Sequence, residues 1–248
     1  MKKQLKEIRR VLRSQADPVK AQGLRKFFKT GKGQYAEGDV FLGITLPAQR
    51  LVARQFASLL LEDISVLLKS SIHEERMTAL LILVGQFKAA DNPAGAGPLR
   101  GSRQKEIFEF YLAHAACINN WDLVDVSAHH IVGAYLHGQS QATQSVVLKR
   151  LAHSKLLWER RIAMVSTWHS IQKGRPEPAL TVAKMLLADE QDLMHKATGW
   201  MLREVGKRVS LPALEDFLQT HHKTMPRTML RYAIEHFPKG KRKAYLLR

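Results

Sequence analysis

Apolar residues recur along this chain at the three- and four-residue intervals of amphipathic helices. In the first segment, Leu5, Ile8 and Leu12 fall on one side of such a helix, with basic residues between them. No stretch alternates apolar and polar residues in the way that a half-buried strand requires. The pattern therefore predicts an all-α protein.

Signals for helix starts and stops divide the chain into helices joined by short turns. Pro18 and Pro47 stand at first-turn positions, where the fixed φ of proline suits a helix. Asn119 and Asn120 provide a natural N-cap before Trp121. The predicted helices span about 2–13, 18–30, 47–59, 64–70, 73–89, 103–118, 121–136, 141–153, 157–172, 176–188, 192–208, 211–221 and 226–237.

Two segments have the composition of loops. Residues 31–40 are rich in turn-forming residues, and residues 91–102 contain the Gly- and Pro-rich stretch that is the clearest linker of the chain. Residues 41–44 look like a short extended link. A linker of this kind need not separate domains, so we treat residues 1–248 as a single domain.

The chain repeats at a period typical of stacked helix pairs. Helices begin near Trp121, Trp158, Asp192 and Met225, which are 37, 34 and 33 residues apart. This spacing predicts an α-solenoid of stacked antiparallel helix pairs, in which one helix of each pair lines a concave face. Residues far apart in the sequence are then expected to meet on that face.

The chain is strongly basic, and its charge is concentrated at the two ends. The net charge is +17, of which residues 1–34 contribute +9 and residues 222–248 contribute +7, which leaves the middle almost balanced. Such a distribution favours a polyanionic partner that is gripped on both sides of a more selective centre. The alternative is that the basic ends only keep the protein in solution.

Cysteine usage and hydropathy indicate where the protein works. Cys117 is the single cysteine, so no intramolecular disulfide can form and a reducing compartment is expected. The longest apolar run, from Met77 to Phe87, is too short to span a bilayer, and the N-terminal segment lacks an apolar signal core. We predict a cytoplasmic protein without membrane contact, and we interpret Cys117 as a small core residue.

The segment Trp121-Asp122-Leu123-Val124-Asp125 is the strongest candidate for chemistry. On a helix, Trp121 and Asp125 share one face, whereas Asp122 looks like a first-turn carboxylate that favours the helix dipole. A carboxylate beside an indole can hold a cationic sugar or base. The alternative interpretation is ordinary helix-start chemistry beside a core aromatic residue.

Two further residues are expected on neighbouring helices of the solenoid. Arg161 can hold a backbone phosphate, or it can be a solvated helix charge. Trp200 can contact the ligand, or it can fill the gap beside Gly199 in a helix pair. Trp158 and Trp168 we assign to packing.

Five segments together resemble the bacterial DNA alkylation repair family, the AlkD-like glycosylases. They are Phe41–Ile44, Trp121–Asp125, Trp158–Arg161, Lys196–Glu204 and Met225–Thr228, and the likeness extends from about Phe27 to the C-terminus. The resemblance implies a HEAT-like solenoid that removes N3- and N7-alkylated purines from double-stranded DNA and leaves an abasic site. The family acts with the base still stacked in the duplex, so no deep pocket is required.

The resemblance also implies roles for individual residues. Asp125 becomes the catalytic carboxylate, Trp121 and Trp200 contact the lesion, and Phe27 stands at a lesion-binding position where the family has Tyr. Arg161 becomes a DNA-phosphate contact, and Thr45 replaces a family Gln. With Arg161 we expect three further residues at the phosphates, namely Arg160, Arg203 and Thr45.

Other chemistries find no support in the sequence. The His residues lack the spacing of a zinc site, so we expect no metal and no cofactor. No lysine stands out as a Schiff-base nucleophile, so the predicted enzyme is a monofunctional glycosylase rather than a lyase. The sequence gives no sign of an oligomer, so we expect a monomer. Two rival interpretations are a non-catalytic solenoid that recognises damaged or branched DNA and a protein-binding scaffold.

Overall fold

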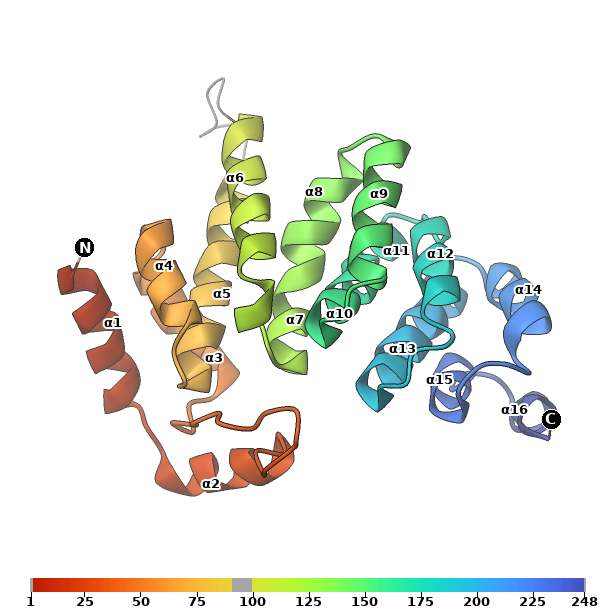
Figure 1. Cartoon of the computed structure of the whole chain (residues 1–248), viewed down its shortest axis with the longest axis horizontal. Coiled ribbons are helices and arrows are strands. Elements are labelled where there is room, and N and C mark those ends of the chain that lie inside the picture. The colour runs from red at the N-terminus through yellow and green to blue at the C-terminus, as the bar shows by residue number, and fades with distance from the viewer. Residues whose placement is uncertain (1, 91–99, 248) are drawn as a thin grey trace. The chain divides into compact units, whose positions relative to one another are not determined.

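The computed structural model describes residues 2–90 and 100–247, and these residues are helical almost throughout (Figure 1). They form two compact units, residues 1–127 and residues 128–248, which are described separately. Within the described residues, the only β-type pairing is one isolated parallel bridge between Val40 and Ile72. The predicted all-α class is therefore confirmed.

The first unit contains the helices that surround the candidate site. They are α1 (Lys2–Ser14), α2 (Pro18–Phe27), α3 (Leu46–Gln55), α4 (Leu61–Leu68), α5 (His73–Ala89), α6 (Arg100–Ala113), the 3-10 helix η1 (Ala115–Cys117) and α7 (Trp121–Ala128), whose last residue belongs to the second unit. Figure 1 shows α2 lying crosswise below α3.

The second unit continues the helical pattern to the C-terminus. Its elements are the π-helix η2 (His129–Gly133), α8 (Ala134–His137), α9 (Gln141–Ala152), α10 (Leu157–Ser166), α11 (Trp168–Gln172), α12 (Glu177–Met185), α13 (Asp192–Arg208), α14 (Leu211–His221), α15 (Arg227–Ala233) and α16 (Lys239–Leu246).

Helix α5 is the centre of the first unit. It packs against α1, α3, α4 and α6, and Leu80 and Leu83 on it are fully buried. Its first turn is polar yet equally buried, and burial of polar groups is tolerated only when they have partners. One such partner comes from α1, where Nε of Arg9 lies 3.0 Å from Oε2 of Glu75. The first turn of α5 is thus fixed in place before any ligand binds.

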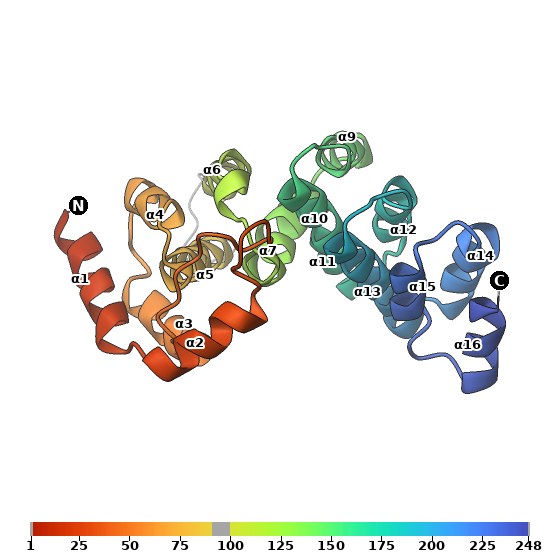
Figure 2. The ribbon, with the colours of Figure 1, turned by 60° about the horizontal axis from the view of Figure 1, so that its bottom comes forward.

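In the second unit, successive inner helices pack directly on one another. Helix α10 contacts α13, and α13 contacts α15, while α9 and α12 pack behind them (Figure 2). Helices α13 and α15 approach each other closely at Gly199, where a Cβ atom would lie 2.4 Å from the carbonyl oxygen of Met229. These contacts confirm the predicted order of inner helices for the part of the repeat that begins at α10.

Several predicted boundaries differ from the observed ones. Helix α6 begins at Arg100, so the loop predicted over 91–102 is shorter, and its residues 91–99 lie outside the described part. Helix α2 ends at Phe27 because Lys29 adopts a left-handed conformation with φ of 54°. The helix predicted over 157–172 is divided at Thr167, whose hydroxyl donates to the carbonyl of Met164.

The C-terminal helix α16 was not predicted from the sequence. Half of the residues in Lys239–Leu246 are Lys or Arg, and none of them is buried, so the segment lacks the apolar periodicity on which the prediction depends.

Candidate functional site

The start of α7 is set by side chains just before and inside its first turn. Oδ1 of Asn120 accepts a hydrogen bond from the backbone N–H of Trp121 at 2.8 Å, and Oδ1 of Asp122 accepts one from Leu123 at 2.8 Å. Asn120 is fully buried, and its amide also donates to Asp39 at 3.3 Å. The carbonyl of Asn120 accepts a hydrogen bond from the backbone N–H of Val124 at 3.3 Å, so Asn120 stands at the N-cap position as predicted, although its side chain bonds to the N–H of the next residue instead of one further along the helix.

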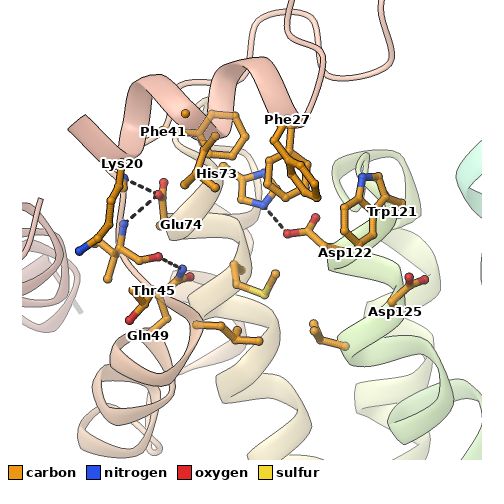
Figure 3. A pocket seen from close by; sticks show the side chains of 18 residues that line it. Lys20, Phe27, Phe41, Thr45, Gln49, His73, Glu74, Trp121, Asp122 and Asp125 are labelled. Atoms are coloured by element: carbon orange, nitrogen blue, oxygen red, sulfur yellow. Dashed lines mark hydrogen bonds and ion pairs between the residues drawn. The ribbon is translucent and has the colours of Figure 1, made fainter. Parts of the chain in front are cut away.

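A cavity of about 560 Å³ lies in the first unit, beside Trp121 (Figure 3). Helix α7 contributes Trp121, Asp122 and Asp125, all of them half-buried. The remaining walls come from α2, the link 41–45, α3 and α5, and their main side chains are Lys20, Phe27, Phe28, Phe41, Thr45, Gln49, His73, Glu74 and Met77. The predicted pair Trp121 and Asp125 thus shares one cavity.

Aromatic rings form most of one side of the cavity. The ring of Phe28 stacks on that of Trp121 at a centroid distance of 5.3 Å and on that of Phe41 at 5.1 Å. Phe28 and Phe41 are buried, whereas Phe27 is 62% exposed and meets Trp121 edge-on at 5.9 Å. The buried rings therefore form a fixed floor, and Phe27 forms an accessible rim.

The extended link between α2 and α3 is fixed by Glu74. The carboxylate of Glu74 accepts backbone hydrogen bonds from Leu42 at 2.9 Å, from Gly43 at 2.8 Å and from Ile44 at 3.3 Å. Gly43 has a φ of 85°, and a Cβ atom there would lie 2.1 Å from the carbonyl oxygen of Asp17. Only glycine fits this crossing, which brings the start of α2 against the site.

A chain of buried polar groups supports Asp122 from below. Nε2 of His73 lies 2.8 Å from Oδ2 of Asp122, and Nδ1 of His73 lies 3.2 Å from Oδ2 of Asp39. The other oxygen of Asp39 accepts a hydrogen bond from Nη2 of Arg76 at 2.6 Å. Figure 3 shows Asp122 reaching from α7 toward His73 on α5. Two carboxylates and two basic groups thus alternate along one hydrogen-bonded network.

The network shifts the pKa of two of its members. Burial opposes the charged form of His73, but its hydrogen bonds to Asp122 and Asp39 outweigh burial and raise the pKa of the imidazole. Burial also opposes the charged form of Asp39, and hydrogen bonding to His73 together with the charge of Arg76 lowers the pKa of that carboxyl group. Both shifts favour the charged forms of these two side chains.

Thr45 and Phe27 lie at the cavity, as the sequence-based assignment requires of residues near the lesion. Thr45 is exposed and occupies the N-cap position of α3 without a side-chain capping bond. Its phosphate contact stays a prediction. Gln49, which lies one turn further along α3, instead donates to the carbonyl of Ile44 at 2.8 Å.

Trp200 lies on α13 in the second unit, next to a second tryptophan. The rings of Trp200 and Trp168 are 6.0 Å apart, both are half-buried, and the guanidinium of Arg208 lies 4.8 Å from the centroid of Trp168. Trp168 thus presents a half-buried indole beside that of Trp200. Trp158, in contrast, is buried, as the packing assignment predicts.

The three arginines assigned to DNA phosphates already have protein partners. Arg161 is only 4% exposed, and its Nη1 donates to the carbonyl of Leu193 at 2.7 Å. Nε of Arg160 pairs with Asp189 at 2.6 Å, and Arg203 pairs with Glu204 and Glu235. Each guanidinium would have to exchange or share a protein partner to bind DNA, and the phosphate contacts of these three arginines stay predictions.

A cluster of basic residues without acidic lining residues occurs near the C-terminus instead. Arg227, Lys239, Arg242 and Lys243 line a hollow of about 380 Å³ together with Leu246 and Leu247. Lys239 and Lys243 are exposed. We call this group of residues the C-terminal basic cluster, and it presents exposed cationic side chains without acidic lining residues.

Sequence reasoning missed most of the cavity floor. The sequence identifies Asp122 only as a helix-start carboxylate, and nothing in it indicates that this residue meets His73, 49 positions away. The one usable signal was the polar start of an apolar helix, His73-Glu74-Glu75-Arg76, which needs buried partners. The prediction for Cys117 was wrong, since this residue is half-buried at the end of η1 and lies outside the core.

Two negative findings apply to residues 2–90 and 100–247. No group of three or more His, Cys, Asp and Glu side chains among them is arranged to hold a metal ion. None of the helices in this part of the chain is both long enough and apolar enough to cross a membrane.

Comparison with known proteins places the chain in a family. The sequence model of the DNA alkylation repair enzyme family matches residues 8–237. The solved structure of a predicted DNA alkylation repair enzyme from Enterococcus faecalis is similar, with a TM-score of 0.66 over 91% of this chain and 98% of that chain, at 15% identity. Identity this low shows a shared fold alone, and no curated protein matches the sequence. Because the family model covers nearly the whole chain, the protein belongs to the DNA alkylation repair enzyme family.

Proposed function

We propose that the protein is a DNA glycosylase that hydrolyses the N-glycosidic bond of N3- or N7-alkylated purines in double-stranded DNA. The observation that carries the proposal is the position of Asp125, which lines an aromatic cavity together with Trp121 on the same helix. Family membership supports a role in DNA repair, and the net charge of +17 suits a DNA substrate.

A single carboxylate suffices for this reaction. Alkylation at N3 or N7 makes the purine cationic, so that the base departs with the electron pair of the broken C–N bond and becomes neutral. Positive charge then develops on the sugar, where the carboxylate of Asp125 stabilises it electrostatically. Water adds to C1′ and loses a proton to Asp125 or to solvent, which leaves an abasic site.

The aromatic residues contribute contacts to the cationic lesion. Trp121 supplies an indole whose face attracts positive charge, and its Nε1–H donates to the hydroxyl of Tyr35 at 3.1 Å, which fixes the ring. Trp200 is proposed as a second aromatic contact and Phe27 as an accessible one. The C-terminal basic cluster and the basic N-terminal segment are proposed to bind phosphates.

The test is the release of methylated purines from methylated duplex DNA by the wild type and by Asp125→Asn. We expect release by the wild type and a loss of at least ~100-fold in Asp125→Asn, since it removes the one charge that stabilises the transition state. Asp216→Asn, at an exposed position on α14, is the matched control and should release bases normally.

Duplex binding must be measured on the same proteins. If the wild type binds duplex DNA and releases no base, the proposed glycosylase activity is wrong, and non-catalytic recognition of damaged DNA becomes the better interpretation. If Asp125→Asn releases bases as fast as the wild type, the reaction stands and the assignment of Asp125 is wrong.

A further inference from the structure

We propose that Trp168 is a positioning residue for Trp200. Glu204 and Arg208 hold Trp168 in the orientation that this role requires. The inference rests on the proposed function, in which Trp200 contacts the lesion, and it does not require the base to leave the helical stack. It extends that function to residues that contact Trp200 instead of the DNA.

The backbone beside Trp200 is fixed by α15, whereas the indole needs a support of its own. A Cβ atom added at Gly199 would come within 2.4 Å of the carbonyl oxygen of Met229 and 2.5 Å of the Cβ atom of Tyr232, so the chain at this position cannot shift. The half-buried ring of Trp200 can still turn about two side-chain bonds. A ring that contacts the substrate must be held more firmly, because a displacement of about 1 Å can cost ~100-fold in rate.

Trp168 supplies this support from α11, which packs against α13 (Figure 2). The ring centroids of Trp168 and Trp200 are 6.0 Å apart and their planes are inclined by 35°, within the range of attractive aromatic pairs. Both indoles are half-buried, so each of them keeps an accessible part. The contact therefore limits the rotation of Trp200 without covering it.

The position of Trp168 is fixed by the break between α10 and α11. At this break, the buried hydroxyl of Thr167 donates to the carbonyl of Met164. The same corner packs on η2, because a Cβ atom added at Gly133 would lie 2.2 Å from the carbonyl oxygen of Ser166. The helix break thus determines where the indole of Trp168 begins.

Arg208 contacts the same indole from the last turn of α13. Its guanidinium carbon lies 4.8 Å from the centroid of the Trp168 ring, which is the distance of a cation–π contact. Trp200 and Arg208 are eight residues apart, so they lie on one face of α13 and are separated by about 12 Å along its axis. Trp168 is therefore held by two residues of α13 that are two turns apart.

Glu204 keeps Arg208 beside the indole. It is 4% exposed, and its Oε2 accepts a hydrogen bond from Nε of Arg208 at 2.7 Å, while Oε1 accepts bonds from Arg203 at 3.0 and 3.2 Å. Burial opposes the charged form of Glu204, but the bonds from the two arginines outweigh burial and lower the pKa of its carboxyl group. A charged Glu204 therefore anchors the guanidinium at neutral pH.

This arrangement predicts an effect on rate more than on affinity. An indole that is already held in place loses little freedom when the lesion arrives, so its contact is fully available in the transition state. Duplex affinity depends mainly on phosphate contacts, to which Trp168 contributes no charge. Loss of Trp168 should therefore slow base release at saturating protein and leave duplex binding almost unchanged.

The first test is a double-mutant cycle on single-turnover release of methylated purines from methylated duplex DNA. We expect Trp168→Leu to slow release about tenfold, and Trp168→Phe to restore most of the rate because it retains a ring. In a Trp200→Leu background, Trp168→Leu should slow release no further, since the two residues act through one contact. Independent losses that add in the double variant, or a wild-type rate in Trp168→Leu, overturn the proposal.

Arg208→Ala tests the same contact without removing a ring. Arg208 is exposed, so the variant should fold, and we expect release to slow by about threefold because the support of Trp168 is weakened. Lys207→Ala removes an exposed cation from the same turn of α13 and is the matched control, which should release bases at the wild-type rate. Equal effects of the two variants would reject the role of Arg208.

A signal from Trp200 itself separates failure of this inference from failure of the proposed function. Labelling with 5-fluorotryptophan gives a ¹⁹F resonance for each of the four tryptophans, and Trp→Phe variants assign them. Without DNA, Arg208→Ala should broaden or shift the resonance of Trp200, and Lys207→Ala should not. An unchanged resonance rejects the positioning role even if the protein releases bases. A changed resonance in a protein that releases no base supports the positioning role and rejects the glycosylase.

Discussion

Nε2 of His73 lies 2.8 Å from Oδ2 of Asp122, although 49 positions separate the two residues in the sequence. The imidazole also contacts Asp39, and Asp39 contacts Arg76, so that acidic and basic groups alternate from the core of the first unit to the wall of its cavity. The contact ties the first turn of α5 to the first turn of α7. The cavity is therefore built on a buried ionic network.

This network predicts a pH dependence of stability. The pKa of His73 is raised above its ordinary value of 6.5, so the folded state binds the proton more tightly than the unfolded chain does. The stabilisation is fully present below the unfolded-state pKa and is lost as the pH rises through the folded-state value. Urea unfolding of wild type and His73→Gln across that window should show a difference that shrinks with rising pH.

The control for this measurement is His153→Gln, because His153 is exposed on its helix and makes only a local contact to the carbonyl of Lys149. Its difference from the wild type should be small, because the substitution removes only a local contact. A difference between wild type and His73→Gln that grows as the pH rises would contradict the direction of the shift.

Gly43→Ala should destabilise the first unit by more than ~3 kcal/mol, since it combines a strained left-handed conformation with a steric clash. The added Cβ would lie 2.1 Å from the carbonyl oxygen of Asp17. Gly38→Ala is a matched control, because Gly38 has the same φ of 85° but no atom within 4 Å of the added Cβ. Chemical denaturation should give a clearly larger loss for Gly43→Ala, and equal losses would refute the steric argument.

Arg161→Ala should lower the free energy of unfolding by ~1.5–3 kcal/mol, as expected when a buried charged donor is removed. The residue is 4% exposed and donates to the carbonyl of Leu193, which lies 32 positions away. Arg150→Ala, at an exposed position on α9, should change stability little. If Arg161→Ala folds normally and loses DNA affinity, the phosphate contact assigned from the sequence is correct after all.

The C-terminal basic cluster should determine how steeply DNA binding depends on salt. Replacing both Lys239 and Lys243 by Ala removes two exposed cations, so the slope of log affinity against log salt should fall by about two. Lys184→Ala, which removes an exposed lysine from α12, is the control and should leave the slope nearly unchanged. An unaltered slope in the double variant would show that DNA phosphates bind at other residues of the protein.

The sequence predicted the fold well because helix periodicity is a local signal. Helices α5, α13 and α14 begin and end where the pattern indicates, and α7 begins directly after Asn120, as predicted. Errors occurred where the signal is weak, as in the charged α16, or where a single residue interrupts a helix, as at Thr167.

Only the part of the candidate site that lies on a single helix could be predicted from the sequence. Trp121 and Asp125 are four residues apart, so their shared face follows from helix geometry. The contact between Asn120 and Asp39 spans 81 positions and depends on tertiary packing, as does the stacking of Phe28 on Trp121. The partners of Arg160, Arg161 and Arg203 are equally invisible in a single sequence.

The first turn of α5 is buried in the core of the first unit and also lines the floor of the cavity. This double role limits which residues of the cavity can be substituted without loss of stability. A change at His73 or Glu74 would alter the lining and also unsettle the packing of the first unit. The rim contributes little to the packing of the core, because Phe27 is 62% exposed at the last position of α2. Under the proposed function, substitutions at Phe27 and Thr45 are therefore expected to change lesion preference with little loss of stability, whereas substitutions at the cavity floor are expected to destabilise the first unit.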